Sequence, residues 1–490
     1  MDWQVNLDRI ASWLAHGKTS AARQALDELR SAGVIPPEEM WRVHELYGAV
    51  FHDLADAEGA AAAYSNAAQS DRFLRSQREH FSNYLFALHY LPGISAEELY
   101  QQHVVYQGLY RDTPEMPPGK AWQHSRLRIG FLSPDFRESS SARFYECLLT
   151  GLDVRSFEVY AYALESFEDD FTRRLQASGL TYRCLAGRNL EQMAETIRWD
   201  EIDVLMDLSG HADGGMTLMV MAQRPAAVQL CGIGWFDTTG LSSVDYVLTD
   251  EAMDPEDSQS EKLFKEKLLR LPHGFCFQPS MAMKQVKRKP RNRKPVTFGS
   301  FQNFMKITRP VMDCWREILQ NLPDSRLIVQ DTTRLPERRT VLQKRLEKAG
   351  LPMERVEVRM GSDAYLAQYQ QVDIMLDTFP YPGGAATATA LYMGVPVIAM
   401  RGDHHSARLS ASILEAAGYP EWLAESADAY IKLALQLAVD GEGLEKTQLQ
   451  LRRELEASAL LDASAYTKAF AQAVKRLSVL DDNMGKGCGI

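Results

Sequence analysis

Two series of short apolar runs that alternate with helical stretches constrain the fold of this chain more than any other feature. The runs have the length of buried strands, and most of the segments between them have a helical period. Parallel strands need such crossover helices, so each series predicts a doubly wound α/β sheet. The predicted strands are Leu127–Ser133, Glu158–Leu164, Asp203–Leu208, Val228–Gly234 and Tyr246–Thr249 in the first series, and Val296–Phe301, Arg326–Gln330, Val356–Met360, Ile374–Asp377 and Val395–Met400 in the second; Val311–Leu319 and Thr340–Lys348 are predicted helices.

The segment before the first series is predicted to be helical. The small-residue run Leu54–Tyr64 resembles the helix–turn–helix of an incomplete tetratricopeptide (TPR) repeat. This region either packs on the next domain or offers a surface for docking a peptide. The predicted parts of the chain are 1–116, helical and TPR-like; 126–280, Rossmann-like; 281–295, a basic linker; 296–460, a second Rossmann-like domain; and 461–490, a helix and tail.

Composition excludes several classes of protein. The 490 residues are 45% hydrophobic and 24% charged, which is typical of a soluble globular protein. The net charge of −11 gives no general attraction to nucleic acid or anionic membranes. No apolar run is long enough for a transmembrane helix, and the first residues do not resemble a signal peptide. The six cysteines show no CxxC spacing, which favours a reducing cytoplasm.

A cluster of basic residues separates the two series. Between Lys284 and Lys294 the chain holds seven lysines and arginines, with prolines on either side of the core. We interpret this stretch as a solvated linker between domains; a site for an acidic or anionic partner is the alternative.

The segment Val372–Gly394 predicts a strand, a glycine turn and a helix. An apolar strand runs into Pro382, Gly383 and Gly384, and an alanine-rich helix follows. Such a turn presents backbone N–H groups and the positive end of a helix dipole, which favour a phosphate or diphosphate. The alternative is an ordinary βα turn of a parallel sheet.

Missing motifs narrow the chemistry further. The chain has no GxGxxG after the first strand of either series, no P-loop, and no pair of aspartates at i and i+2 that could hold a metal on a diphosphate. Lys306, just past the strand Val296–Phe301, is therefore the best candidate to neutralise a diphosphate, although a lone lysine can also be a plain surface charge. Thr308 is predicted to cap the helix that follows, with Pro310 in its first turn.

Seven motifs occur in order along about residues 80–460. They are Ser133–Arg137, Asp207–His211, Arg224–Gln229, Gly234–Gly240, Val244–Tyr246 with Leu248–Asp250, Gly299–Thr308 and Leu391–Val397. With these motifs the chain resembles the O-GlcNAc transferase (SPINDLY-like) family of protein glycosyltransferases, and its bacterial branch in particular.

The resemblance implies a fold, an activity and a donor site. The fold is the glycosyltransferase B architecture of two Rossmann-like domains, with a cleft between them and the nucleotide sugar on the second. The activity is metal-independent, inverting transfer of a sugar to protein, with no cofactor besides the donor, UDP-GlcNAc or UDP-glucose. The donor-binding residues implied are Gly234, Asn303, Lys306, Met360, Tyr365, Gly383, Gly384, Ala385, Ala386, Thr387 and Thr389.

Four residues depart from the family pattern. Ser139 stands where similar proteins carry a histidine, Ala385-Ala386 replace two threonines of the diphosphate turn, and Thr389 replaces the acidic residue that holds the ribose. Each lost hydrogen bond to a charged group weakens donor binding by roughly 1.5–3 kcal/mol.

We therefore predict an enzyme that moves GlcNAc, or glucose, to a Ser, Thr or Asn side chain of a polypeptide such as an adhesin or flagellin. Lys306 stabilises the leaving diphosphate, and His211, Asp135 and Asp237 are candidates for the base. The alternative is a pseudoenzyme that stabilises an active glycosyltransferase. Both hypotheses place the protein in the cytoplasm, with the helical N-terminal region available for homo- or hetero-oligomer contacts.

Overall fold

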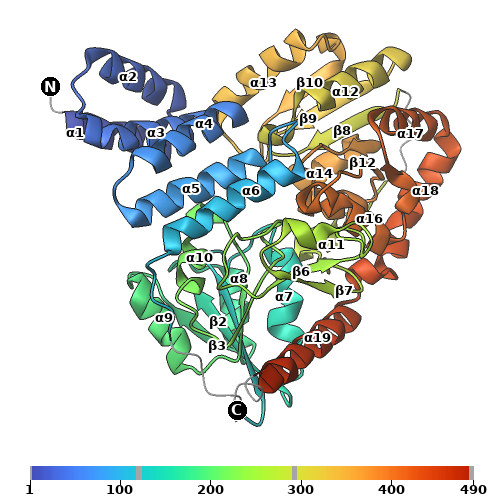
Figure 1. The fold of residues 1–490 in the computed structure, drawn as a ribbon. Coiled ribbons are helices and arrows are strands. Elements are labelled where there is room, and N and C mark those ends of the chain that lie inside the picture. The colour runs from blue at the N-terminus through green and yellow to red at the C-terminus, as the bar shows by residue number, and fades with distance from the viewer. Residues whose placement is uncertain (1–2, 117–123, 290–294, 485–490) are drawn as a thin grey trace. The chain divides into compact units, whose positions relative to one another are not determined.

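The computed structural model describes residues 3–116, 124–289 and 295–484, which form two compact units (Figure 1). Unit 1 contains residues 1–95, 281–403 and 419–454, and unit 2 contains residues 96–280, 404–418 and 455–490. The units cut across the predicted parts of the chain, because the helical N-terminal region is divided after residue 95 and a short segment near residue 410 joins unit 2. Within the described residues, no helix is long and apolar enough to cross a membrane.

The first helices of unit 1 form a small helical layer with its own core. The core contains Leu7, Ile10, Leu26, Val43 and Val50, all fully buried. The helix–turn–helix predicted from the small residues is present, and Asp56 caps its second helix by accepting the N–H of Gly59. The helices are α1 (Trp3–Ala15), α2 (Thr19–Ala32), α3 (Met40–Asp53), α4 (Ala57–Ser70) and α5 (Leu74–Leu88).

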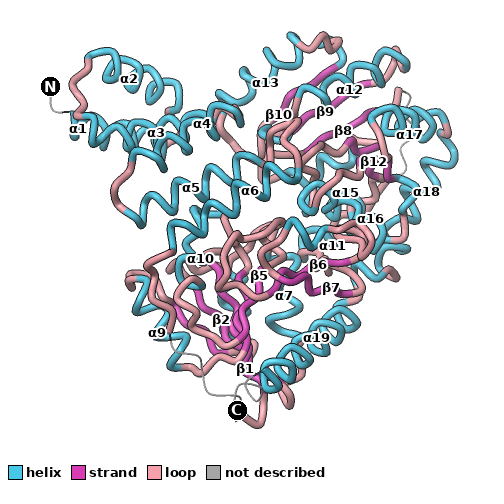
Figure 2. The backbone as a smooth tube through the Cα atoms, in the orientation of Figure 1, coloured by secondary structure: helices cyan, strands magenta, loops and turns pink. Residues whose placement is uncertain are grey.

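The sheet of unit 1 has six parallel strands in the order β10-β9-β8-β11-β12-β13. Its strands are β8 (Thr297–Phe301), β9 (Arg326–Gln330), β10 (Val356–Arg359), β11 (Ile374–Leu376), β12 (Val397–Met400) and β13 (Leu423–Ala424). Its helices are α11 (Met281–Gln285), α12 (Arg309–Asn321), α13 (Pro336–Lys348), α14 (Tyr365–Gln368), α15 (Ala385–Tyr392), α17 (Ala427–Val439) and α18 (Gly441–Glu456). Figure 2 shows these strands as magenta segments among cyan helices.

The sheet of unit 2 has seven parallel strands in the order β3-β2-β1-β4-β5-β6-β7. Its strands are β1 (Leu127–Ser133), β2 (Phe157–Ala163), β3 (Thr181–Cys184), β4 (Val204–Asp207), β5 (Val228–Cys231), β6 (Tyr246–Asp250) and β7 (Lys267–Leu271). Its helices are α6 (Ala96–Tyr106), α7 (Ala142–Gly151), α8 (Asp170–Ala177), α9 (Leu190–Trp199), α10 (Met216–Met221), α16 (Leu409–Ala417) and α19 (Ala463–Met484). The prediction of two doubly wound α/β sheets after a helical segment is confirmed.

The strands that the sequence did not predict are all at sheet edges. They are β3, β7 and β13, of which β3 is partly exposed and β7 begins with an exposed lysine. An edge strand is covered less completely than a central one, so its sequence lacks the continuous apolar run that identifies a buried parallel strand.

Segments from the C-terminal half of the sequence complete unit 2. The C-terminal helix α19 stacks Phe470 on Phe131 of β1, and the Tyr466 hydroxyl donates to the Gly274 carbonyl (3.0 Å). Before α16, His405 Nδ1 lies 2.6 Å from a carboxylate oxygen of Asp254 in a fully buried pair. Burial lowers the pKa of His405, but the charge of Asp254 and its hydrogen bond, together with the charges of Asp237 and Asp250, raise it above its usual value.

The basic stretch is only partly a solvated linker. The side chain of Arg288 is almost fully buried in unit 1, where it donates to the carbonyl oxygens of Tyr369 (2.7 Å) and Val372 (2.8 Å). The prediction that this stretch is solvated is therefore wrong for Arg288. Its guanidinium donates to two backbone carbonyl oxygens just before β11. Arg291, Arg293 and Lys294 lie outside the described residues.

Burial in the sheet of unit 1 predicts where substitution is most damaging. Phe298, at the centre of β8, has no exposed surface, whereas Val439 at the end of α17 is 72% exposed. We expect Phe298→Ala to lower the free energy of unfolding by about 3–5 kcal/mol. Val439→Ala should change it by less than about 0.5 kcal/mol. Urea unfolding followed by circular dichroism measures both, and equal midpoints for the two variants would contradict this packing.

Candidate functional site

Two loops of unit 1 meet at the point where its strand order reverses. Strand β8 leads into residues 302–308, here called the lysine loop, and β11 leads into residues 379–384, here called the glycine turn. The two strands are parallel neighbours, so their carboxyl ends lie together. The crossovers run in opposite directions from this pair, and ligands of doubly wound sheets bind at this switch point.

The buried carboxylate of Asp377 joins the two loops. One oxygen accepts the N–H of Thr378 (2.8 Å) and the side-chain amide of Gln302 (2.9 Å). The other accepts the hydroxyl of Thr387 in the first turn of α15 (3.3 Å). A β-carbon on Gly383 would lie 2.5–2.9 Å from Thr387, Gln302 and Asp377, so only glycine fits at this joint.

Gly384 serves a different purpose from Gly383. Its φ of +56° and ψ of −109° suit only glycine, and a β-carbon there would meet nothing within 4 Å. The helix α15 begins at the next residue, so open space lies beside the positive end of its dipole. The sequence predicted that the backbone N–H groups of this turn are free to bind a phosphate. The N–H of Ala386 is not, because it donates to the Gly383 carbonyl (3.3 Å).

Lys306 extends from the lysine loop to the glycine turn. Its ammonium donates to the Pro382 carbonyl (2.6 Å) and lies 4.3 Å from the centre of the Tyr381 ring. Burial lowers the pKa of Lys306 to about 8, and the charge of Asp377 partly opposes this shift. The unliganded protein therefore loses this positive charge as the pH rises through about 8, whereas a bound diphosphate would favour the charged form.

Asn303 is held with its amide in a fixed orientation. Its oxygen accepts the N–H of Met305 (3.0 Å) and a guanidinium N–H of Arg338 on α13 (2.7 Å). Both partners are donors, so they require the oxygen at this position and leave the NH₂ group for a ligand. Arg338 is only 1% exposed and forms an ion pair with Asp331 (3.1 Å) after β9.

Thr308 connects the loops instead of capping a helix through its side chain. It occupies the position before α12, with proline in the first turn as predicted, but its hydroxyl donates to the Phe379 carbonyl (3.0 Å). The predicted side-chain cap is therefore wrong, because a carbonyl of the neighbouring loop takes the hydroxyl.

The remaining predicted donor residues of unit 1 differ in how far they are buried. Thr387 is buried and spends its hydroxyl on Asp377, while Thr389 lies 7% exposed in the same helix. Met360 is half-buried directly after β10, and Tyr365 is 39% exposed at the start of α14. All three of the residues Met360, Tyr365 and Thr389 thus belong to unit 1, as Lys306 does. Met360 follows the end of β10, Tyr365 begins α14, and Thr389 lies in α15.

The other predicted residues belong to unit 2. Gly234 follows β5, and a β-carbon there would lie 1.8 Å from the Leu208 carbonyl, so close packing inside the unit already requires this glycine. Asp237 is 6% exposed and accepts the N–H of Thr238 (2.7 Å). Asp135, after β1, forms an ion pair with Arg137.

His211 lies inside unit 2 and not on its surface. It has no exposed area, its Nε2 lies 2.9 Å from the Thr239 carbonyl, and its ring packs against those of Tyr106 and Trp235. Burial, reinforced by His103, holds the pKa of His211 well below its usual value. In this conformation a neutral imidazole that donates to a carbonyl does not reach an external hydroxyl, so the geometry disfavours His211 as a base.

Ser139 takes a local role at the start of α7. Its hydroxyl oxygen accepts the N–H of Ala142 (3.2 Å), as a helix-capping side chain does. A serine at this position therefore has a structural reason independent of any ligand.

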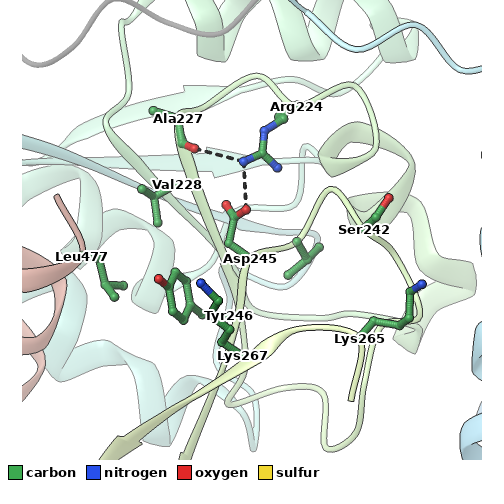
Figure 3. Close-up of a pocket in the computed structure, with 10 residues that line it drawn as sticks. Arg224, Ala227, Val228, Ser242, Asp245, Tyr246, Lys265, Lys267 and Leu477 are labelled. Atoms are coloured by element: carbon green, nitrogen blue, oxygen red, sulfur yellow. Dashed lines mark hydrogen bonds and ion pairs between the residues drawn. The ribbon is translucent and has the colours of Figure 1, made fainter. Parts of the chain in front are cut away.

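A pocket of unit 2 lies at the amino ends of strands β5, β6 and β7 of its sheet (Figure 3). It is lined by the first residues of three strands, Val228, Tyr246 and Lys267, and Arg224 is committed to Asp245 (2.8 Å). Ligands of doubly wound sheets bind at the carboxyl ends of strands, so this pocket does not extend the candidate site.

Three residues that build the site were not predicted from the sequence. They are Asp377, Tyr381 and Arg338, and only Asp377 has a signal in the sequence, a carboxylate directly after a buried strand. The other two act through partners far along the chain, which no local pattern reveals.

Comparisons with known proteins show the family of this chain. The family model described as glycosyl transferase family 41 matches residues 103–289 and 279–470. A probable UDP-N-acetylglucosamine–peptide N-acetylglucosaminyltransferase SPINDLY of Solanum lycopersicum is 33% identical over 407 residues, which cover 79% of this chain and 42% of that protein. The corresponding protein SEC of Arabidopsis thaliana is 25% identical over 370 residues, 72% of this chain and 37% of that protein. The chain thus spans less than half the length of these curated relatives.

A solved structure is similar over its full length. A lysine-to-methionine mutant of the Thermobaculum terrenum O-GlcNAc transferase superposes with a TM-score of 0.79 at 25% identity, covering 99% of both chains. The family model spans most of both parallel sheets and includes both loops of the candidate site. The chain therefore belongs to glycosyl transferase family 41.

Proposed function

We propose that this protein is a UDP-sugar-dependent protein glycosyltransferase that transfers GlcNAc to Ser or Thr side chains of a polypeptide. The observation that carries the proposal is Lys306, whose ammonium lies beside a glycine turn and a helix N-terminus at the switch point of unit 1. The relatives named as UDP-N-acetylglucosamine–peptide N-acetylglucosaminyltransferases support the donor and the acceptor class.

In the proposed reaction, unit 1 stabilises the departing diphosphate. The acceptor oxygen forms a bond to the anomeric carbon while the bond from that carbon to the diphosphate oxygen breaks, with inversion. Negative charge then develops on the diphosphate, where Lys306, the NH₂ group of Asn303 and the dipole of α15 stabilise it. The acceptor proton passes to a base, for which Asp135 and Asp237 stay our candidates.

The departures at the diphosphate turn favour a second candidate function. Ala385 and Ala386 offer no hydroxyl, and Thr389 offers no carboxylate. A pseudoenzyme that binds and stabilises an active glycosyltransferase would tolerate these losses, as would an enzyme for another sugar such as glucose or for an Asn acceptor. Acceptors such as an adhesin or flagellin, a cytoplasmic location, and oligomer contacts through helices α1–α5 belong to the proposal.

Lys306→Met should abolish transfer while the protein stays folded. The substitution keeps the length of the side chain and removes the charge that acts on the leaving group, so turnover should fall by at least about 100-fold. Radiolabelled transfer from UDP-GlcNAc to a peptide library measures this. Lys344→Met, at an exposed lysine of α13, is the matched control. Turnover near the wild-type value in Lys306→Met would remove this lysine from the mechanism.

Transfer should not depend on a divalent metal. The diphosphate charge is met by a lysine and a helix dipole, so the rate in excess EDTA should equal the rate in excess Mg²⁺ or Mn²⁺ within about twofold. A strict metal requirement would show that the diphosphate binds elsewhere.

Restoring hydroxyls should tighten donor binding. Ala385→Thr with Ala386→Thr should lower the dissociation constant of UDP by at least about 100-fold, since each new hydroxyl can donate to a charged phosphate oxygen. Adding Thr389→Glu should lower it further through the ribose. Calorimetry measures the series, and Ala427→Thr at the first residue of α17 is the matched control. Low-micromolar binding by the wild type with no gain from threonine would mean that the alanines are neutral replacements.

A further inference from the structure

The N-terminal helices of unit 1 contact both loops of the candidate site through a small set of side chains. These contacts join residues about 290 positions apart in sequence, all inside one compact unit. None of the contacts described below involves a backbone hydrogen bond between strands of the sheet.

Arg345 of α13 bridges the helix–turn–helix and the lysine loop. One guanidinium N–H donates to the carbonyl of Ala55 (3.0 Å), in the turn between α3 and α4, and another donates to the carbonyl of Ile307, directly after Lys306. The guanidinium is largely buried, which lowers the pKa of Arg345, and the nearby carboxylate of Asp56 favours its charge. Ala55 has a φ of +57°, so its carbonyl is presented by a turn of unusual geometry.

Tyr381 bridges the end of α5 and the lysine. Its ring lies 5.2 Å from that of Tyr90 and 6.4 Å from that of Phe86, both edge-on, and 6.0 Å from the ring of His89. The same ring carries the Lys306 ammonium 4.3 Å from its centre. Tyr381 is only 7% exposed, so the α5 aromatics fix the surface against which the lysine rests.

Arg338 provides a third connection. Its guanidinium donates to Asn303 of the lysine loop, and the carboxylate of Asp53 at the end of α3 favours its charged form. Residues of α3, the turn after it, and α5 therefore surround the two arginines and the tyrosine that hold the loops.

We infer that helices α3–α5 form part of the donor site, with Arg345 and Tyr381 as positioning residues that hold Lys306 where a diphosphate binds. The inference deepens the proposed function and rests on it. A loosened lysine would rotate into solvent, and each donor bound would then have to order it again. Loss of either positioning residue should thus weaken UDP binding and lower turnover, without changing the KM for the acceptor peptide.

Simple attachment of the helices would give a different pattern. Glu337 of α13 accepts both the N–H and the hydroxyl of Ser20 (2.8 Å each), which ties α2 to α13 without touching either loop. Glu337→Gln therefore serves as a matched control that weakens helix attachment alone.

The test compares UDP binding by calorimetry in full-length Arg345→Met, Tyr381→Leu, Tyr381→Phe and Glu337→Gln. We expect Arg345→Met and Tyr381→Leu to raise the dissociation constant at least tenfold. Tyr381→Phe keeps the ring and should restore binding to within about threefold, and Glu337→Gln should match the wild type. Wild-type affinity in both Arg345→Met and Tyr381→Leu would overturn the inference, as would an equal loss in Glu337→Gln.

Hydrogen exchange separates this inference from the proposed function. In the absence of nucleotide, Arg345→Met should speed exchange in a peptide covering residues 301–308, and Tyr381→Leu should do so in one covering 379–388, with β9 as the internal standard. Unchanged exchange in both would overturn the inference whatever the UDP result. Faster exchange in a protein whose wild type binds no UDP would support the positioning and refute the proposed function. Arg345→Lys, which cannot reach both carbonyls, replaces Arg345→Met if thermal unfolding shows that variant to be unfolded.

Discussion

The buried carboxylate of Asp377 is the interaction on which the candidate site depends. It lies at the end of β11, next to β8, and its two oxygens accept hydrogen bonds from Gln302 of the lysine loop, from the backbone of Thr378 just before the glycine turn, and from Thr387 in the first turn of α15. A buried carboxylate is stable only when its acceptor capacity is used, so these three elements are held in one arrangement. The absence of a β-carbon at Gly383 allows the approach.

In this arrangement the ammonium of Lys306 contacts a neutral carbonyl and an aromatic ring. These two groups stabilise an ammonium less than an anion would. The side chain is half-buried, and burial lowers the pKa of Lys306 to about 8. A diphosphate over Gly384 would therefore meet a cation that needs little reorganisation, which is the physical basis of electrostatic catalysis.

The helical layer contributes to the contacts that hold the lysine loop. The loop is short and contains a single 3₁₀ turn, so few of its hydrogen bonds lie within the loop itself. Two arginines of α13 hold its side-chain and backbone oxygens, and α3–α5 hold the arginines. The TPR-like helix–turn–helix of α3 and α4 thus packs against α13 inside unit 1, in addition to any surface that it offers to a peptide.

The sequence by itself determined the two α/β sheets, the position of Lys306 and the strand–glycine turn–helix of Ile374–Tyr392, because these depend on local periodicity and on residues adjacent to a strand end. The edge strands β3 and β7 escaped detection because partial exposure interrupts the apolar run, and β13 because it is only two residues long. Tertiary structure alone decided that His211 is buried, that Thr308 bonds Phe379, and that Arg338, Arg345 and Tyr381 hold the site. Each of these depends on a partner distant along the chain, and a local sequence pattern carries no information about which distant carbonyl or ring will lie within reach.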